Sequence, residues 1–166
     1  MFDTLSRYLL GIPGQPSRTA LRFVLTPAID RLSTQALTSS GLAINAAGAA
    51  FAKTGAAAFY ATAGGKLVTL APGTAMPALT GVAIPAGFFG VVCFFVDSGG
   101  VLTMAGGTPT ASLAGALWPT FPLGKALVGA LVITGVGAFI GGTTALDAAT
   151  TVYLSPAGAF DPTALV

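Results

Sequence analysis

The run Phe88-Phe89-Gly90-Val91-Val92-Cys93-Phe94-Phe95-Val96 (residues 88–96) decides the fold class of this chain. It is rich in valine and phenylalanine, and the turn Asp97-Ser98-Gly99-Gly100 leads from it into Val101-Leu102-Thr103-Met104. Two apolar runs joined by a glycine-containing turn indicate a β-hairpin. Residues 88–96 are apolar at both parities, whereas a half-exposed strand alternates with polar residues. We therefore expect this strand either to lie beneath other structure or to pack its outward face on another subunit.

Further strands are predicted on both sides of this hairpin. Residues 59–62 and 67–70 flank Ala63-Gly64-Gly65-Lys66, which is a second hairpin signal. Residues 126–134, again apolar on both faces, and residues 150–154 complete the set. Short strands at this spacing, separated by glycine-rich turns, predict an all-β fold. We expect an antiparallel β-sandwich or barrel-like body.

The charges are concentrated near the N-terminus. The chain has seven basic and five acidic side chains, and six of these twelve fall within the first 31 residues: Asp3, Arg7, Arg18, Arg22, Asp30 and Arg31. This shift in composition predicts a boundary near Ser39-Ser40-Gly41. We expect an N-terminal arm over residues 1–40 and a β-rich body over residues 41–166.

The arm has the sequence features of one or two short helices. Ser17 is a suitable N-cap for a helix over residues 17–25, Pro27 follows close after its end, and residues 29–37 could form a second helix. Two interpretations stay open: a solvated tail, or a segment that orders on a neighbouring subunit. We favour the second because the arm has too many apolar side chains for a tail: Leu21, Phe23, Val24, Leu25 and Ile29.

The scarcity of charge bears on the environment of the protein. A soluble domain usually has about a quarter of its residues charged, whereas 7% of this chain is charged and its mean hydropathy is +0.85. Large contiguous apolar patches are rare on monomers. We therefore expect much of the surface to be covered by a bilayer, by sister subunits or by a larger assembly, and we favour the assembly.

A membrane protein is the alternative from another class. Two windows, residues 67–96 and 126–146, have no charge, and the second would need to be helical to span a bilayer. The first contains three prolines and the second five glycines, and neither has a basic cluster at one end. The start Met1-Phe2-Asp3 also lacks the features of a signal peptide. We expect no membrane partner.

The sequence offers almost no catalytic chemistry. Histidine and glutamate are absent, so the commonest general bases and metal ligands are missing. Asp97 and Asp147 lie beside turn signals, where we expect them to cap turns. Cys93 is the sole cysteine, which excludes an intrachain disulfide, and its apolar neighbours predict an inert core thiol. We expect no enzyme, no metal, no cofactor and no small-molecule substrate.

The order of motifs in the C-terminal two thirds resembles a known class of protein. It runs through Tyr60…Gly65-Lys66-Leu67-Val68-Thr69, Ile84-Pro85-Ala86-Gly87, residues 96–103, Pro122-Leu123-Gly124-Lys125, Phe139-Ile140-Gly141-Gly142 and Tyr153…Gly158-Ala159-Phe160-Asp161-Pro162-Thr163. This order, over residues 59–163, resembles small structural proteins of tailed bacteriophages that are encoded among the head genes. The resemblance implies a virion component without an active site, present as trimers or clusters on a capsid or at the base of head fibres.

We therefore expect a capsid decoration, cement or minor head protein, located in the virion. Its partners would be the major capsid protein and copies of itself, as a homotrimer or other homo-oligomer, without nucleic acid. The candidate assembly contacts are Arg7, Arg18, Arg22, Phe23, Ile29, Arg31 and Trp118. A head-fibre, spike or tail component with a receptor-binding tip is the alternative within virions, and Trp118 would be its anchor.

Overall fold

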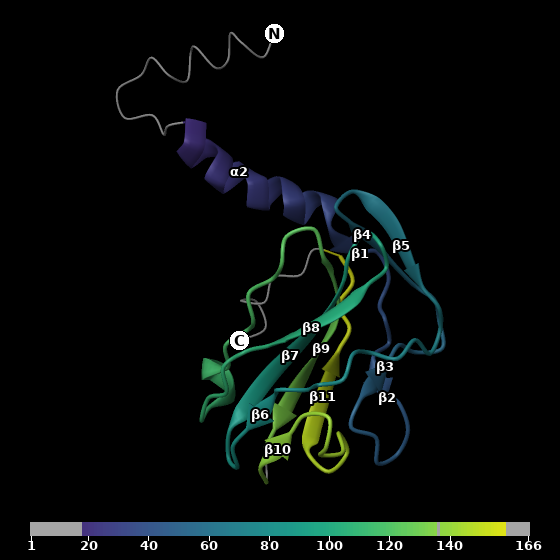
Figure 1. Ribbon diagram of the computed structural model, residues 1–166, viewed down its shortest axis with the longest axis vertical. Coiled ribbons are helices and arrows are strands. Elements are labelled where there is room, and N and C mark those ends of the chain that lie inside the picture. The colour runs from purple at the N-terminus through teal and green to yellow at the C-terminus, as the bar shows by residue number, and fades with distance from the viewer. Residues whose placement is uncertain (1–17, 136, 159–166) are drawn as a thin grey trace.

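The structure, a computed structural model, describes residues 18–135 and 137–158 (Figure 1). Within these ranges there is one α-helix, α2(Arg18–Ser33), and one 3-10 turn, η1(Leu113–Gly115). All other elements are strands: β1(Gln35–Ala36), β2(Ala43–Ile44), β3(Ala52–Lys53), β4(Phe59–Ala63), β5(Lys66–Leu70), β6(Ala83–Ile84), β7(Phe89–Val96), β8(Leu102–Gly106), β9(Ala126–Thr134), β10(Phe139–Ile140) and β11(Thr150–Leu154). The expected all-β class with antiparallel sheets is confirmed, and in the described ranges no sheet closes into a barrel.

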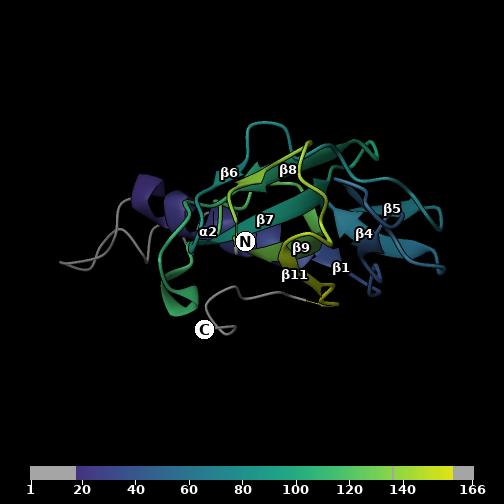
Figure 2. The ribbon, with the colours of Figure 1, turned by 90° about the horizontal axis from the view of Figure 1, so that it is seen from below.

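The largest sheet has four antiparallel strands in the order β11-β9-β7-β8 (Figure 2). Its central strands are β7 and β9, the two segments that the sequence marks as apolar on both faces. The predicted hairpin from residues 88–96 into residues 101–104 is therefore present as β7 and β8. Strands β9 and β11 also lie where the sequence predicts them.

A β-bulge in β9 changes which side chains face the core. Phe94 pairs with Gly129 and Phe95 pairs with Leu127, so Val128 is the additional residue. One extra residue moves every following side chain to the other face of the sheet. Accordingly, Val128 and Leu131 both belong to the main core although their parities differ. Alternation of polar and apolar residues cannot predict this shift, because both faces of β9 are apolar.

Smaller sheets surround the four-stranded one. Strand β4 pairs with β5 and with β1, β6 pairs with β10, and β2 pairs with β3. The β4–β5 hairpin is the second hairpin predicted from the sequence. Its turn residues Gly64 and Gly65 have φ angles of 55° and 77°, the left-handed region that glycine enters without steric cost.

Both faces of β7 are covered by this chain itself. Phe94 and Val96 belong to the main core, which includes Phe59 of β4 and Ile84 of β6. The other face of β7 contributes Val91, Cys93 and Phe95 to a second cluster, against which Trp118 and Phe121 pack from the loop before β9. Of the two expectations for residues 88–96, burial beneath other structure is therefore the one observed. The apolar character of β7 no longer requires a second subunit.

The arm forms one helix where the sequence predicts a break. Helix α2 continues through Pro27 to Ser33, so the expectation that Pro27 follows a helix end is wrong. A proline in a helix interior costs about 3 kcal/mol because it removes a hydrogen bond and crowds the preceding turn. Contacts beyond Pro27 favour continuation, since Gly124 N donates to Asp30 Oδ1 at 2.9 Å and Gly65 N donates to the Ser33 carbonyl at 3.0 Å.

The second predicted helix, residues 29–37, is also wrong beyond Ser33. Gln35 and Ala36 form β1, which pairs with β4, and Ala36 makes a further bridge to Gly158. Ser40, at the predicted boundary, is buried and its hydroxyl donates to Ser155 Oγ at 3.2 Å. Gln35 and Ala36, which we assigned to the arm, therefore belong to the β1-β4-β5 sheet, and Ser40 packs against the body.

The two uncharged windows contain strands and loops. Residues 126–146 hold β9 and β10, so the helix that the membrane alternative requires there is absent. Among the residues that the structure describes, no helix has the length and hydropathy needed to cross a membrane.

Candidate assembly interface

The described residues contain no cluster of metal-ligating side chains. Cys93 is fully buried in the second cluster, and desolvation raises the pKa of its thiol far above the ordinary value. A thiol that stays protonated is a poor nucleophile. The expectation of a buried core thiol at Cys93 is confirmed.

The two aspartates beside turn signals have different roles. Asp97 Oδ1 accepts hydrogen bonds from Gly99 N at 2.9 Å and Val101 N at 3.0 Å, and these bonds lower the pKa of the carboxyl group. Asp97 therefore caps the β7–β8 turn, as predicted. Asp147 Oδ2 instead accepts from Gly48 N at 2.8 Å. Asp147 therefore joins the β2–β3 loop to the segment before β11. The prediction that Asp147 caps its own turn is wrong.

Helix α2 projects away from the sheets at the end of the body where β1 and β4 lie (Figure 1). Hydrogen bonds join the last turn of the helix to the body, through Asp30 and Ser33. Apolar side chains are exposed along the helix. We call Phe23, Leu25, Ile29 and Leu32 the α2 surface.

Of the α2 surface, Leu25, Ile29 and Leu32 lie within about 60° of one another on one side of the helix, and Phe23 lies on the opposite side. Phe23 is 82% exposed, Ile29 62% and Leu32 76%. Phe23 and Leu32 are nine positions apart, which at about 3.6 residues per turn places them on opposite sides of the helix. Contact with a single flat partner would leave one of these sides in water.

The structure brings together only part of the predicted contact set. Arg22, Phe23 and Ile29 are exposed on α2. Arg18 and Arg31 belong to the same helix, with Arg18 one turn before Arg22. Arg7 lies outside the described residues.

Trp118 is separate from the arm residues. Its ring packs edge-on against Phe121 at 6.4 Å, and Phe121 packs against Phe95 of β7 at 5.3 Å. The loop that contains Trp118 thus covers the second face of the main sheet. The sequence favours core or subunit packing of Trp118 over receptor contact, and in the structure the ring packs within the chain.

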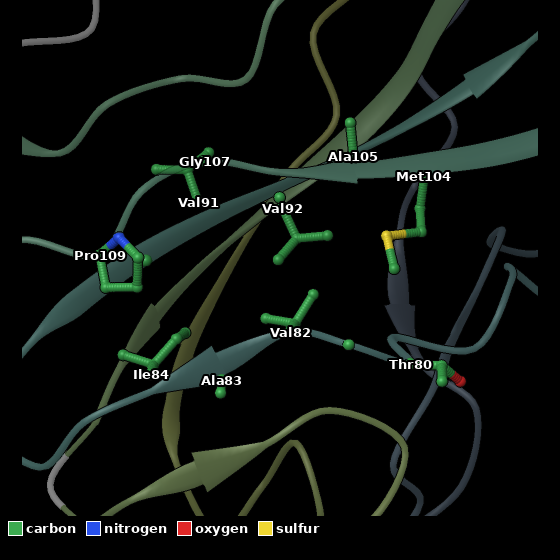
Figure 3. A pocket seen from close by; sticks show the side chains of 13 residues that line it. Thr80, Val82, Ala83, Ile84, Val91, Val92, Met104, Ala105, Gly107 and Pro109 are labelled. Atoms are coloured by element: carbon green, nitrogen blue, oxygen red, sulfur yellow. The ribbon is translucent and has the colours of Figure 1, made fainter.

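Sequence reasoning missed two features. Leu32 lies in the segment for which a separate second helix was expected, so it was not grouped with Phe23. A groove of about 360 Å³ between β8 and residues 80–84 was also missed (Figure 3). Two strand glycines that line it, Gly90 and Gly106, were the available signal, because glycine in a strand often marks a close approach of other structure.

Neither a protein-family model, nor a curated protein, nor a solved structure matches this chain.

Proposed function

We propose that this protein is a non-enzymatic structural component of a bacteriophage virion, a capsid decoration or minor head protein that attaches through α2. The observation that carries the attachment is the exposure of Phe23, Ile29 and Leu32 on opposite sides of a projecting helix. The virion assignment rests on the resemblance in motif order over residues 59–163. The partner is the major capsid protein, which would surround α2 with apolar side chains.

The charge of α2 defines the partner further. The helix contains Arg18, Arg22 and Arg31 against one acidic residue, Asp30, whose carboxylate already accepts a hydrogen bond from Gly124. A complementary site would therefore combine an apolar cleft with acidic residues at its rim, since charges at an interface rim favour encounter with the correct partner.

In this proposal α2 attaches the protein to the particle, and the β-rich body lies on the particle surface. We propose that it is a sandwich-like module in which the four-stranded sheet packs against the β1-β4-β5 sheet. Its support is the shared main core, to which β4 contributes Phe59 and Ala61 and β9 contributes Val128 and Leu131. Sheets that pack face to face over one core are the usual arrangement in sandwiches.

The first test is quantitative mass spectrometry of purified particles, with this chain counted against the major capsid protein. Copies near one per capsid subunit are expected for a decoration protein. A few to a few dozen copies would move the protein to a vertex, fibre or tail. Its absence from particles would contradict the virion assignment.

The second test addresses α2 directly. In the double variant Ile29→Gln and Leu32→Gln we expect at least tenfold weaker binding to particles that lack the protein, with unchanged thermal stability, because both side chains are exposed in the isolated chain. Leu67→Gln is the matched control, since Leu67 is 65% exposed on β5, away from the helix. Equal binding by both variants would exclude α2 as the attachment element.

A further inference from the structure

Strand β8 has an open hydrogen-bonding edge. Asp97 N donates to the Val101 carbonyl at 3.1 Å and Gly107 N donates to the Val91 carbonyl at 2.7 Å. Together with the register, these bonds show which residues of β8 have backbone groups that face β7 and which have groups that face away. Backbone groups of odd-numbered residues face β7, and those of Leu102, Met104 and Gly106 face away from it. Within residues 18–135 and 137–158, no hydrogen bond uses these outward groups.

This edge lacks the usual protection against pairing with another strand. Natural edge strands are blunted by charged residues, prolines or bulges. Residues 101–106 contain neither charge nor proline, and the β7–β8 register is regular. Lys125 Nζ donates to Thr103 Oγ1 at 3.1 Å. Thr103 points to the face of the sheet opposite Leu102 and Met104, so this lysine leaves the other face of the edge uncharged.

The groove described above lies beside this edge. Its lining includes Val82 and Ile84 on one side and Met104 and Gly106 on the other, with Val92 at its floor. Figure 3 shows the side chains of Val92 and Met104 directed toward Val82 across the space. The lining has no charged residue. A strand added to β8 would direct alternate side chains into this apolar groove.

We propose that the occupant is β8 of a second copy of this chain, antiparallel and related by a two-fold axis that lies midway between the two Met104 residues. In this register Met104 faces Met104 of the second copy, and Leu102 faces Gly106 of the second copy. The outward backbone N–H and C=O groups of Leu102, Met104 and Gly106 are then all paired, because even-numbered residues face outward in both copies. The side chain of Leu102 of one copy then lies opposite Gly106 of the other, which has no side chain, at the groove that Val82 lines.

Charge and size favour a second copy as this occupant. An uncharged strand suits an uncharged groove, and a charged peptide would bury a charge without a partner. Five residues per copy are far fewer than the roughly 20–30 per side of a stable interface. The pairing is therefore weak in solution and depends on protein concentration. It gains strength where many copies are held side by side, because tethering raises the effective concentration. The inference does not depend on the proposed attachment to a capsid.

Cysteine cross-linking tests the register. Residues in a hydrogen-bonded antiparallel pair have Cα atoms about 5.5 Å apart, which lies within the range that a disulfide spans. The full-length Met104→Cys variant should give a disulfide-linked dimer under mild oxidation. The native Cys93 is fully buried and does not interfere. The control Leu67→Cys, exposed on β5, should give at least tenfold less dimer, and equal yields would overturn the proposal.

Sedimentation of the reduced full-length protein provides an independent measurement. Met104→Pro removes one outward N–H while the ladder to β7, made by odd-numbered residues, keeps its donors. We expect at least tenfold weaker self-association than for the native chain, with circular dichroism confirming the fold. Undiminished association would overturn the proposal, as would loss of association in the Ile29→Gln and Leu32→Gln variant alone. If the proline variant does not fold, the yields of the two cysteine variants decide.

Discussion

At the scale of single residues, Gly129 shows how closely the main sheet is packed against the chain segments beside it. A Cβ atom at this position would lie 2.7 Å from the Leu154 carbonyl oxygen and 3.2 Å from Leu42 Cδ2. The first of these contacts is with the backbone of β11, which cannot turn aside as a flexible side chain can. Glycine is therefore required here by space, next to the bulge residue Val128.

We predict that Gly129→Ala lowers the free energy of unfolding by about 1–3 kcal/mol, the usual cost of overpacking a core. Urea denaturation measures the change. Gly137→Ala is the matched control, because no described residue other than its chain neighbours has an atom within 4 Å of the position that its Cβ would take. If both variants lost the same stability, loss of glycine itself rather than the contact with β11 would be the cause.

At the scale of elements, the loop before β9 acts as a cover for the second face of the main sheet. Trp118 and Phe121 pack over Phe95, which is fully buried. Without this cover, the odd-numbered side chains of β7 would be exposed to water. The loop therefore buries this face of β7. The sequence left open whether other parts of the chain or a neighbouring subunit would do so.

Truncation of the cover should have a measurable cost. We predict that Trp118→Ala destabilises the protein by about 2 kcal/mol, less than the 3–5 kcal/mol of a fully buried tryptophan because the ring is half-buried. Thermal denaturation and binding of a hydrophobic dye report the change. The control Leu113→Ala, in the same loop but exposed, should change stability by less than about 0.5 kcal/mol. A Trp118 variant as stable as the control would contradict a covering role.

The elements that the sequence predicts are those whose signals are local. The β4–β5 and β7–β8 hairpins have their turn glycines and apolar runs within a few residues of each other. In contrast, β1 and β6 are two-residue strands defined only by partners distant in the sequence, β4 and β10. The bulge in β9 leaves no trace in a segment that is apolar on both faces. These features depend on tertiary contacts, which outweigh local propensity.

The candidate site was predictable to a similar extent. The apolar residues of the arm, such as Phe23 and Ile29, lead to the prediction, from composition alone, that the arm is an assembly element. The continuation of α2 past Pro27 was not predictable, since it depends on hydrogen bonds from Gly124 and Gly65. The groove beside β8 is formed by residues 80–84 and 104–107, which only the folded chain brings together.

At the scale of the whole molecule, the arm and the body meet at a position that differs from the compositional boundary. Strand β1 pairs with β4, Ala36 bridges to Gly158, and Ser40 bonds to Ser155. These contacts follow Ser33, the end of α2. The packed body therefore extends at least from Gln35, and the segment that can be removed without damage to the sheets ends near Ser33.

Two truncations separate these boundaries. A chain that begins at Thr34 loses α2 but keeps β1, so we expect its melting temperature to stay near that of the full chain. A chain that begins at Gly41 also loses β1 and the buried Ser40, and we expect a decrease of at least about 5 °C, which corresponds to one or two kcal/mol in a domain of this size. Both truncated chains lose the hydrogen bond from Gly124 to Asp30, so its loss does not contribute to the difference between their melting temperatures.

Both truncated chains should also fail to bind particles, because both lack α2. Equal melting temperatures would show that residues 34–40 add nothing to the body, and the arm would then extend to Ser40 as its composition predicts.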